Sequence, residues 1–134
     1  MKISGYVYKF GNKIGSSNVI ADKESFVRAT TKLDRIPCLM GYPEDCNNFN
    51  MHKVVGYAYC DVMPDGVFAS VDVIEGTQYS RILNKMSDDE LKDNLQFGFL
   101  AIGKIKDNLM TDITTPYIVL QCNSFHYPVE HIER

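Results

Sequence analysis

One turn sequence constrains this chain more than any other feature. Residues 63–66 have the sequence MPDG, in which proline presets φ and glycine accepts a positive φ, so the backbone can reverse there. Runs rich in valine, alanine and tyrosine flank the turn on both sides. Residues 53–75 are therefore predicted to form a β-hairpin.

The hairpin turn also sets which residues face each other. Tight-turn pairing makes the numbers of facing residues sum to about 129. One face is then small and apolar, and we expect it to be buried. It comprises Gly56, Ala58, Cys60, Val62, Val67, Ala69, Val71 and Val73. The other face pairs Tyr57 with Asp72 and Tyr59 with Ser70. This mixed chemistry suits a partly covered surface or the exterior of a barrel.

Length and charge limit the kind of protein. The 134 residues suit one domain over 1–134, whose core needs neither disulfides nor metals. The net charge of −3, from 14 basic and 17 acidic side chains spread along the chain, offers nucleic acid or an anionic membrane no electrostatic attraction. No apolar run reaches the roughly 18 residues of a membrane span, and residues 1–4 do not open a signal peptide. We expect a chain made and kept in the cytoplasm.

The four cysteines are scattered along the chain without a C-x-x-C pair. They are Cys38, Cys46, Cys60 and Cys122. Because one of them falls on the predicted buried face of the hairpin, free and mostly packed thiols are favoured over a disulfide framework or a zinc site.

The remaining patterns predict further strands and two helices. Strands are predicted at residues 3–10, 36–40, 97–105 and 117–125, with loops at 41–50 and 107–115. Helices are predicted at 23–29, after an Asp22 cap, and from residue 77 onward, continued or restarted by a capping box at 87–90. Together these predict a β-rich α+β fold: a small barrel of about six strands with two outer helices. An open α+β sheet is the alternative.

No arrangement of catalytic or metal-binding groups emerges from the residues. In the hairpin register His52 lies roughly 23 Å from Ser70, at about 3.3 Å per residue, so the two cannot form a dyad. His126 follows the last strand near Ser124, where a turn or edge role is favoured, and we expect His131 to be solvated. We find no metal motif and no phosphate-binding loop, and predict no catalytic residues, metal or cofactor.

Four tyrosines are candidates for a protein-binding surface. They are Tyr6, Tyr8, Tyr57 and Tyr59. Tyrosine combines a large contact area with a hydrogen-bonding tip, which suits protein interfaces. The alternative, which we favour slightly, is that these side chains pack beneath helices on the exterior of the sheet.

Short patterns along nearly the whole chain suggest a family. They are SGYV at 4–7, IPCL at 36–39, VVG at 54–56 with DGVF at 65–68, LQFGF at 95–99 and LQCNSFHYP at 120–128. In their order they resemble the prohead maturation proteases of tailed bacteriophages. That resemblance implies the barrel fold which this family shares with the herpesvirus assembly proteases.

The resemblance also implies where catalytic residues would stand. The family's histidine follows the Pro-Leu strand, where this chain continues with Gly41. Its nucleophilic serine corresponds to Gln96, and its glutamate and serine in the closing strand correspond to Gln121 and Asn123. Because an amide cannot replace an activated hydroxyl, the resemblance implies that the scaffold is kept and proteolysis is lost.

The leading hypothesis is therefore a non-enzymatic virion protein of a tailed phage, made in the host cytoplasm. It would act as a capsid auxiliary, decoration or head-assembly component, binding the major capsid protein or other head proteins, and could form homo-oligomers. One alternative is a divergent active serine-type prohead protease, in which His52 pairs with Ser124 or another hydroxyl. The other is a small intracellular protein-binding module.

Overall fold

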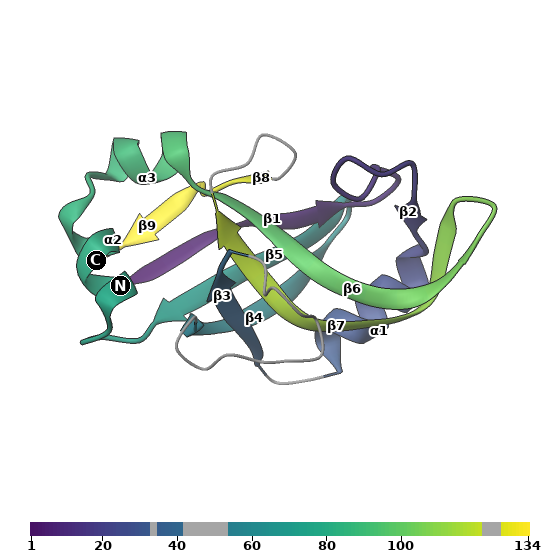
Figure 1. Cartoon of the computed structure of the whole chain (residues 1–134), viewed down its shortest axis with the longest axis horizontal. Coiled ribbons are helices and arrows are strands. Elements are labelled where there is room, and N and C mark those ends of the chain that lie inside the picture. Colours follow the sequence, from purple (N-terminus) through teal and green to yellow (C-terminus); the bar gives the residue numbers. More distant parts are fainter. Residues whose placement is uncertain (33–34, 42–53, 122–126) are drawn as a thin grey trace.

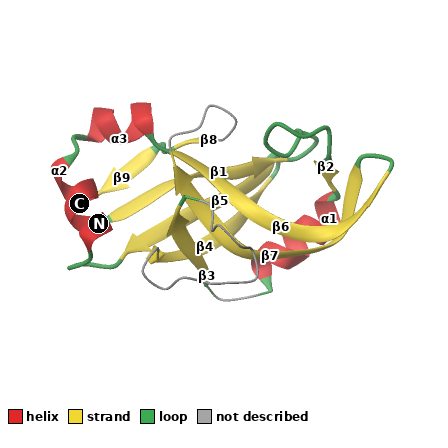
Figure 2. Cartoon of the chain, in the orientation of Figure 1, coloured by secondary structure: helices red, strands yellow, loops and turns green. Residues whose placement is uncertain are grey.

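Strands dominate the computed structural model of the chain, which describes residues 1–32, 35–41, 54–121 and 127–134 (Figure 1). The strands within these ranges are β1 (Lys2–Lys9), β2 (Ile20–Ala21), β3 (Ile36–Met40), β4 (Val54–Met63), β5 (Gly66–Val73), β6 (Gln96–Lys106), β7 (Leu109–Gln121), β8 (Tyr127–Pro128) and β9 (His131–Glu133). The helices are α1 (Lys23–Thr31), α2 (Gln78–Lys85) and α3 (Asp88–Asn94) (Figure 2). The predicted β-rich α+β class is confirmed.

The central hairpin has the predicted register. Strands β4 and β5 pair Tyr57 with Asp72 and Tyr59 with Ser70. Gly56, Ala58 and the alternate residues of β5 from Val67 to Val73 are buried, as the small apolar face predicts. The expectation of burial fails on β4 toward the turn, where Cys60 is only half-buried and Val62 is 46% exposed. The pairing of β4 with β3 ends at Ala58, whereas β1 still pairs with β5 there and Val67 stays buried.

The strands form one mixed sheet in the order β8-β6-β7-β3-β4-β5-β1-β9, with β2 paired to β7. Strands β2 and β3 run parallel to β7, and the other pairs are antiparallel. The hydrogen-bonded path is not closed, and the described residues form nine strands and three helices. The predicted barrel of about six strands with two helices is therefore wrong in these counts. Three strands of only two or three residues are too short to produce an alternating pattern in the sequence.

Strands β6 and β7 form a long hairpin where a loop was predicted at 107–115. Its two turn residues, Asp107 and Asn108, have φ of 52° and 60°. Asp and Asn tolerate this left-handed geometry, which a two-residue hairpin turn of type I′ requires. The predicted strand at 117–125 is described only to Gln121, and most of the predicted loop at 41–50 lies outside the described residues.

Helix α1 carries aromatic packing into the core. Asp22 caps it as predicted, with Oδ2 accepting a hydrogen bond from the Ser25 amide at 3.1 Å. The buried Phe26 ring lies 5.0 Å from that of Tyr8 and 4.7 Å from that of Phe99, centroid to centroid. One aromatic cluster thus joins α1, β1 and β6.

The helical segment after β5 divides into two. The predicted capping box is present, since the Glu90 amide donates to Ser87 Oγ at 3.1 Å and the Ser87 amide donates to Glu90 Oε1 at 3.2 Å. The capping box starts α3 as a helix separate from α2, so the chain has three helices where two were predicted. Helices α2 and α3 both lie near the chain termini (Figure 1). No helix in the described part of the chain is long and apolar enough to span a membrane.

Candidate functional site

Three positions distant in sequence meet where β3 ends, β6 begins and β7 ends. The Gly41 amide, just after β3, donates to the Leu120 carbonyl of β7 at 2.9 Å. The next residue of β7, Gln121, is the register partner of Gln96, the first residue of β6. We call Gly41, Gln96 and Gln121 the amide corner. In the resemblance to the prohead proteases, Gln96 corresponds to the family's nucleophilic serine and Gln121 to its glutamate. Gly41 stands where the family's histidine follows the Pro-Leu strand.

The chemistry available at the amide corner is binding rather than proton transfer. The side chains of Gln96 and Gln121 are both half-buried. A primary amide donates and accepts hydrogen bonds but is neither a nucleophile nor a general base at neutral pH. His52, Asn123, Ser124 and His126 lie outside the described residues, so the dyad of the protease alternative is not part of this geometry.

A register shift in β1 divides the four candidate tyrosines. Between Tyr6 and Tyr8 the pairing with β5 slips, and the two side chains point to opposite sides of the sheet. Tyr8 is only 1% exposed, and its hydroxyl donates to the Asn12 carbonyl and accepts from the Ala21 amide. Burial raises the pKa of Tyr8. Tyr8 is therefore a core residue and cannot belong to a binding surface.

The other three tyrosines share the side of the sheet opposite the main core, where Tyr57 is half-buried and packs against a small second cluster of Leu39, Val54 and Val119. Register pairing across β4, β5, β1 and β9 arranges this surface, which we call the outer sheet face, in three rows. The rows are Tyr57, Asp72, Lys2 and Glu133; Tyr59, Ser70, Ser4 and His131; and Asp61, Phe68 and Tyr6. The hairpin predicted the pairs between β4 and β5, but their neighbours on β1 and β9 are distant in sequence, so no short motif could have predicted the complete rows.

Aromatic rings and mixed charges characterise the outer sheet face. The rings of Tyr6 and Phe68 meet edge to face with centroids 5.4 Å apart. The Tyr6 hydroxyl donates to Asp65 Oδ1 at 2.7 Å, and this hydrogen bond is the main cause that raises the pKa of Tyr6. The guanidinium of Arg35 lies 5.3 Å from the centre of the Tyr59 ring, which is 39% exposed. Such half-exposed aromatics with polar tips suit protein contacts.

The middle row brings two serine hydroxyls and an imidazole onto neighbouring strands. Ser4 Oγ donates to Ser70 Oγ at 3.2 Å, and His131 is the register partner of Ser4 on β9. The centre of the exposed imidazole lies 6.2 Å from that of the Phe68 ring, with the two planes tilted by 53°, and no hydrogen bond joins the imidazole to a hydroxyl in the described residues. His131 was expected to be solvated, and it is exposed. The sequence did not predict its strand pairing, because β9 has only three residues.

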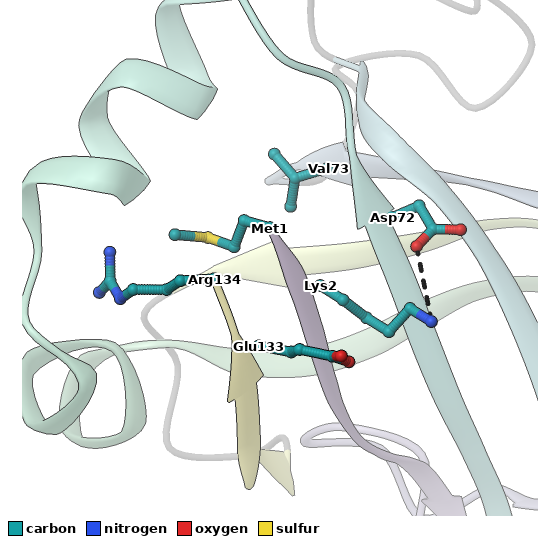
Figure 3. A pocket seen from close by; sticks show the side chains of 6 residues that line it. All are labelled: Met1, Lys2, Asp72, Val73, Glu133 and Arg134. Carbon is teal, nitrogen blue, oxygen red and sulfur yellow. Dashed lines mark ion pairs between the residues drawn. The ribbon is translucent and has the colours of Figure 1, made fainter.

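A cavity of about 300 Å³ lies at the end of β1, β5 and β9 (Figure 3). It is lined by Met1, Lys2, Asp72, Val73, Glu133 and Arg134. Lys2 Nζ lies 3.9 Å from Asp72 Oδ1, so part of the charge is already paired. The charged side chains of this lining are two cations and two anions, and the lining contains no hydroxyl, thiol or imidazole.

Comparisons with protein-family models, with curated proteins and with solved structures found no match. The function of the chain is inferred from its own residues and geometry.

Thiols and metal ligands add no reactive group within the described residues. Cys38 is fully buried and Cys60 is half-buried, and both are free thiols. Burial raises the pKa of each thiol to about 12, with smaller contributions from Cys60 on Cys38 and from Asp61 on Cys60. Both are therefore protonated and unreactive at neutral pH. No group of three or more metal-ligating side chains is found among the described residues.

Proposed function

We propose that the chain is a non-enzymatic head protein of a tailed phage, acting as a capsid auxiliary, decoration or head-assembly component. In this proposal its open sheet is a degenerate form that descends from a prohead-protease-like barrel of about six strands with two outer helices. The amide corner carries the argument. Gly41, Gln96 and Gln121 are distant in sequence, yet they are neighbours in the fold. A chance likeness of short motifs gives no reason for three such positions to meet, whereas descent from a common active site does.

The chemistry of those positions supports the proposed loss of catalysis. A protease of this type needs a hydroxyl that an adjacent base activates. Positions 96 and 121 face each other and are both glutamine, so they provide neither the hydroxyl nor the base. Retention of a folded scaffold without its nucleophile favours a role in binding, although the fold alone does not define that role.

The outer sheet face is the proposed contact with the capsid. Tyr6, Tyr57 and Tyr59 lie on neighbouring or next-neighbouring strands, with Phe68 between them. Tyrosine is enriched among the residues that dominate binding energy at protein interfaces. The proposed partners are the major capsid protein or other head proteins, and the proposed location is the virion.

The test combines virion composition with reactivity. Mass spectrometry of purified virions should detect the chain, and a serine-reactive fluorophosphonate should leave the pure protein unlabelled. Incubation with its own phage's capsid and scaffold proteins should give no cleavage. Specific cleavage that survives Gln96→Ala but not His52→Ala would establish the active-protease alternative. Absence from virions, with a host protein co-purifying, would establish the intracellular binding module.

A further inference from the structure

The segment 127–134, which we call the C-terminal strap, provides both edge strands of the sheet. Its first part, β8, pairs with β6 through Tyr127 and Pro128. Its second part, β9, pairs with β1 at the positions of Lys2, Ile3 and Ser4. Between them, the Val129 amide donates to the Leu95 backbone carbonyl at 3.2 Å, and the Glu130 amide donates to the Ser4 backbone carbonyl at 2.8 Å. Eight consecutive residues thus bridge β1 and β6, two strands that touch but that no ladder joins directly (Figure 1).

The strap is attached by few buried contacts. Val129, at 2% exposure, is its one fully buried side chain, and Tyr127 and Ile132 are half-buried. The other five side chains are exposed. Its ladders contain two residue pairs with β6 and three with β1, against eight between β4 and β5. Elements with so few buried contacts open locally at a lower free energy than the whole fold.

Polar anchors nevertheless make the strap's binding site specific for its sequence. At one end, the Tyr127 hydroxyl accepts hydrogen bonds from the Lys9 amide at 3.2 Å and from Asn12 Nδ2 at 2.8 Å. At the other end, the Arg134 guanidinium donates to Asp88 Oδ1 at 2.9 Å and to the Met86 carbonyl. These contacts set the register in which the strap lies across β1 and β6.

We propose that this site also binds the strap of a second copy, so that two copies assemble by exchanging straps. When a strap leaves, β1 and β6 both present unpaired backbone groups, which readily pair with another strand. The same segment from a neighbouring copy restores every ladder pair, the Val129 contact and both polar anchors. Exchange of an identical element costs little for this reason. The inference concerns self-assembly and does not depend on the proposed role in the capsid.

Cysteine pairing across β1 and β9 tests the exchange. In a background with the four native cysteines replaced by alanine, an isotopically labelled Ser4→Cys chain is mixed with an unlabelled His131→Cys chain. The mixture is unfolded, refolded together at high concentration and oxidised. Ser4 and His131 are register partners, so their β-carbons lie roughly 4.5–5.5 Å apart, close to disulfide distance. A disulfide that joins labelled to unlabelled chain reports an exchanged strap.

The matched control replaces His131→Cys by Ser70→Cys. Ser70 is the partner of Ser4 on the other side of β1, but it belongs to β5, which has strands on both sides and cannot exchange alone. We expect at least tenfold more mixed disulfide with His131→Cys than with Ser70→Cys. Equal yields in the two arms, or no mixed disulfide in either, would overturn the proposal.

A second measurement needs no substitution, and so covers the case in which the cysteine variants fail to fold. Labelled and unlabelled chains of the natural sequence are refolded together and weighed by native mass spectrometry. A mixed dimer that increases with concentration is expected, whereas monomer alone at all concentrations would overturn the proposal. Presence in the virion is measured separately, so failure here leaves the capsid role intact.

Discussion

Gln96 and Gln121 face each other across the β6–β7 ladder, at the start of one strand and the end of the other. The Gly41 amide bonds to the Leu120 carbonyl beside them. The amide corner therefore offers amide donors and acceptors of hydrogen bonds, and a hydroxyl introduced at one glutamine position would face the amide of the other.

Restoring a hydroxyl alone should not restore catalysis. In Gln96→Ser the new side chain would face the amide of Gln121, which cannot take its proton. We expect fluorophosphonate labelling to stay within twofold of the unaltered chain, with an active serine hydrolase as the positive control. Strong labelling of the variant would mean that another residue supplies the base, and would revive the protease alternative.

Removing rings from the outer sheet face should weaken binding without unfolding the chain. The combined variant Tyr57→Ser and Tyr59→Ser should bind purified phage heads about tenfold more weakly or worse, since interface tyrosines often contribute most of the affinity. Ile82→Ser is the matched control, because Ile82 is also an exposed large hydrophobic side chain, at 54%, but lies on α2 rather than on a strand of this face. Unchanged binding by the tyrosine variant in a sedimentation assay would discard the surface.

The two tyrosines on either side of the β1 register shift should respond differently to loss of the hydroxyl. Tyr8→Phe leaves the Ala21 amide and the Asn12 carbonyl without that partner, which should cost about 1–2 kcal/mol of unfolding free energy. Tyr6→Phe removes one exposed bond to Asp65 and should cost less. Urea unfolding of both variants measures the difference. Equal losses would contradict the assignment of Tyr8 to the core.

The thiols of Cys38 and Cys60 should make the free energy of unfolding fall at high pH. Folding raises the pKa of Cys38 and of Cys60 from the ordinary 9.0 to about 12, so the unfolded chain loses these protons first. The contribution of these thiols to the free energy of unfolding is therefore fully present below pH 9. It is lost as the pH rises toward 12, by up to about 1.4 kcal/mol per pH unit for each thiol. Urea unfolding from pH 8 to pH 11 measures the slope. The double variant Cys38→Ala and Cys60→Ala should reduce it, and an unchanged slope would exclude the thiols as its cause.

Local chemistry determined the parts of this fold that the sequence predicted well. The MPDG turn and its alternating flanks determined the β4–β5 register, because a tight turn and a one-sided apolar pattern admit few pairings. Asp22 and the pair of Ser87 and Glu90 likewise marked helix starts through bonds that span only three residues. The catalytic positions implied by the family resemblance could be placed along the sequence but not in space.

Pairing between distant segments decided the rest. Whether Tyr8 points inward depends on a register shift against β5, and whether Gln96 meets Gln121 depends on two register shifts in the ladder between β6 and β7. The strap's strands carry too few residues for a periodic signal, and they form because β1 and β6 leave edges that it can pair with. Turn and cap chemistry act over a few bonds, so they can be recognised in the sequence, whereas edge pairing is decided by the balance of contacts over the whole sheet.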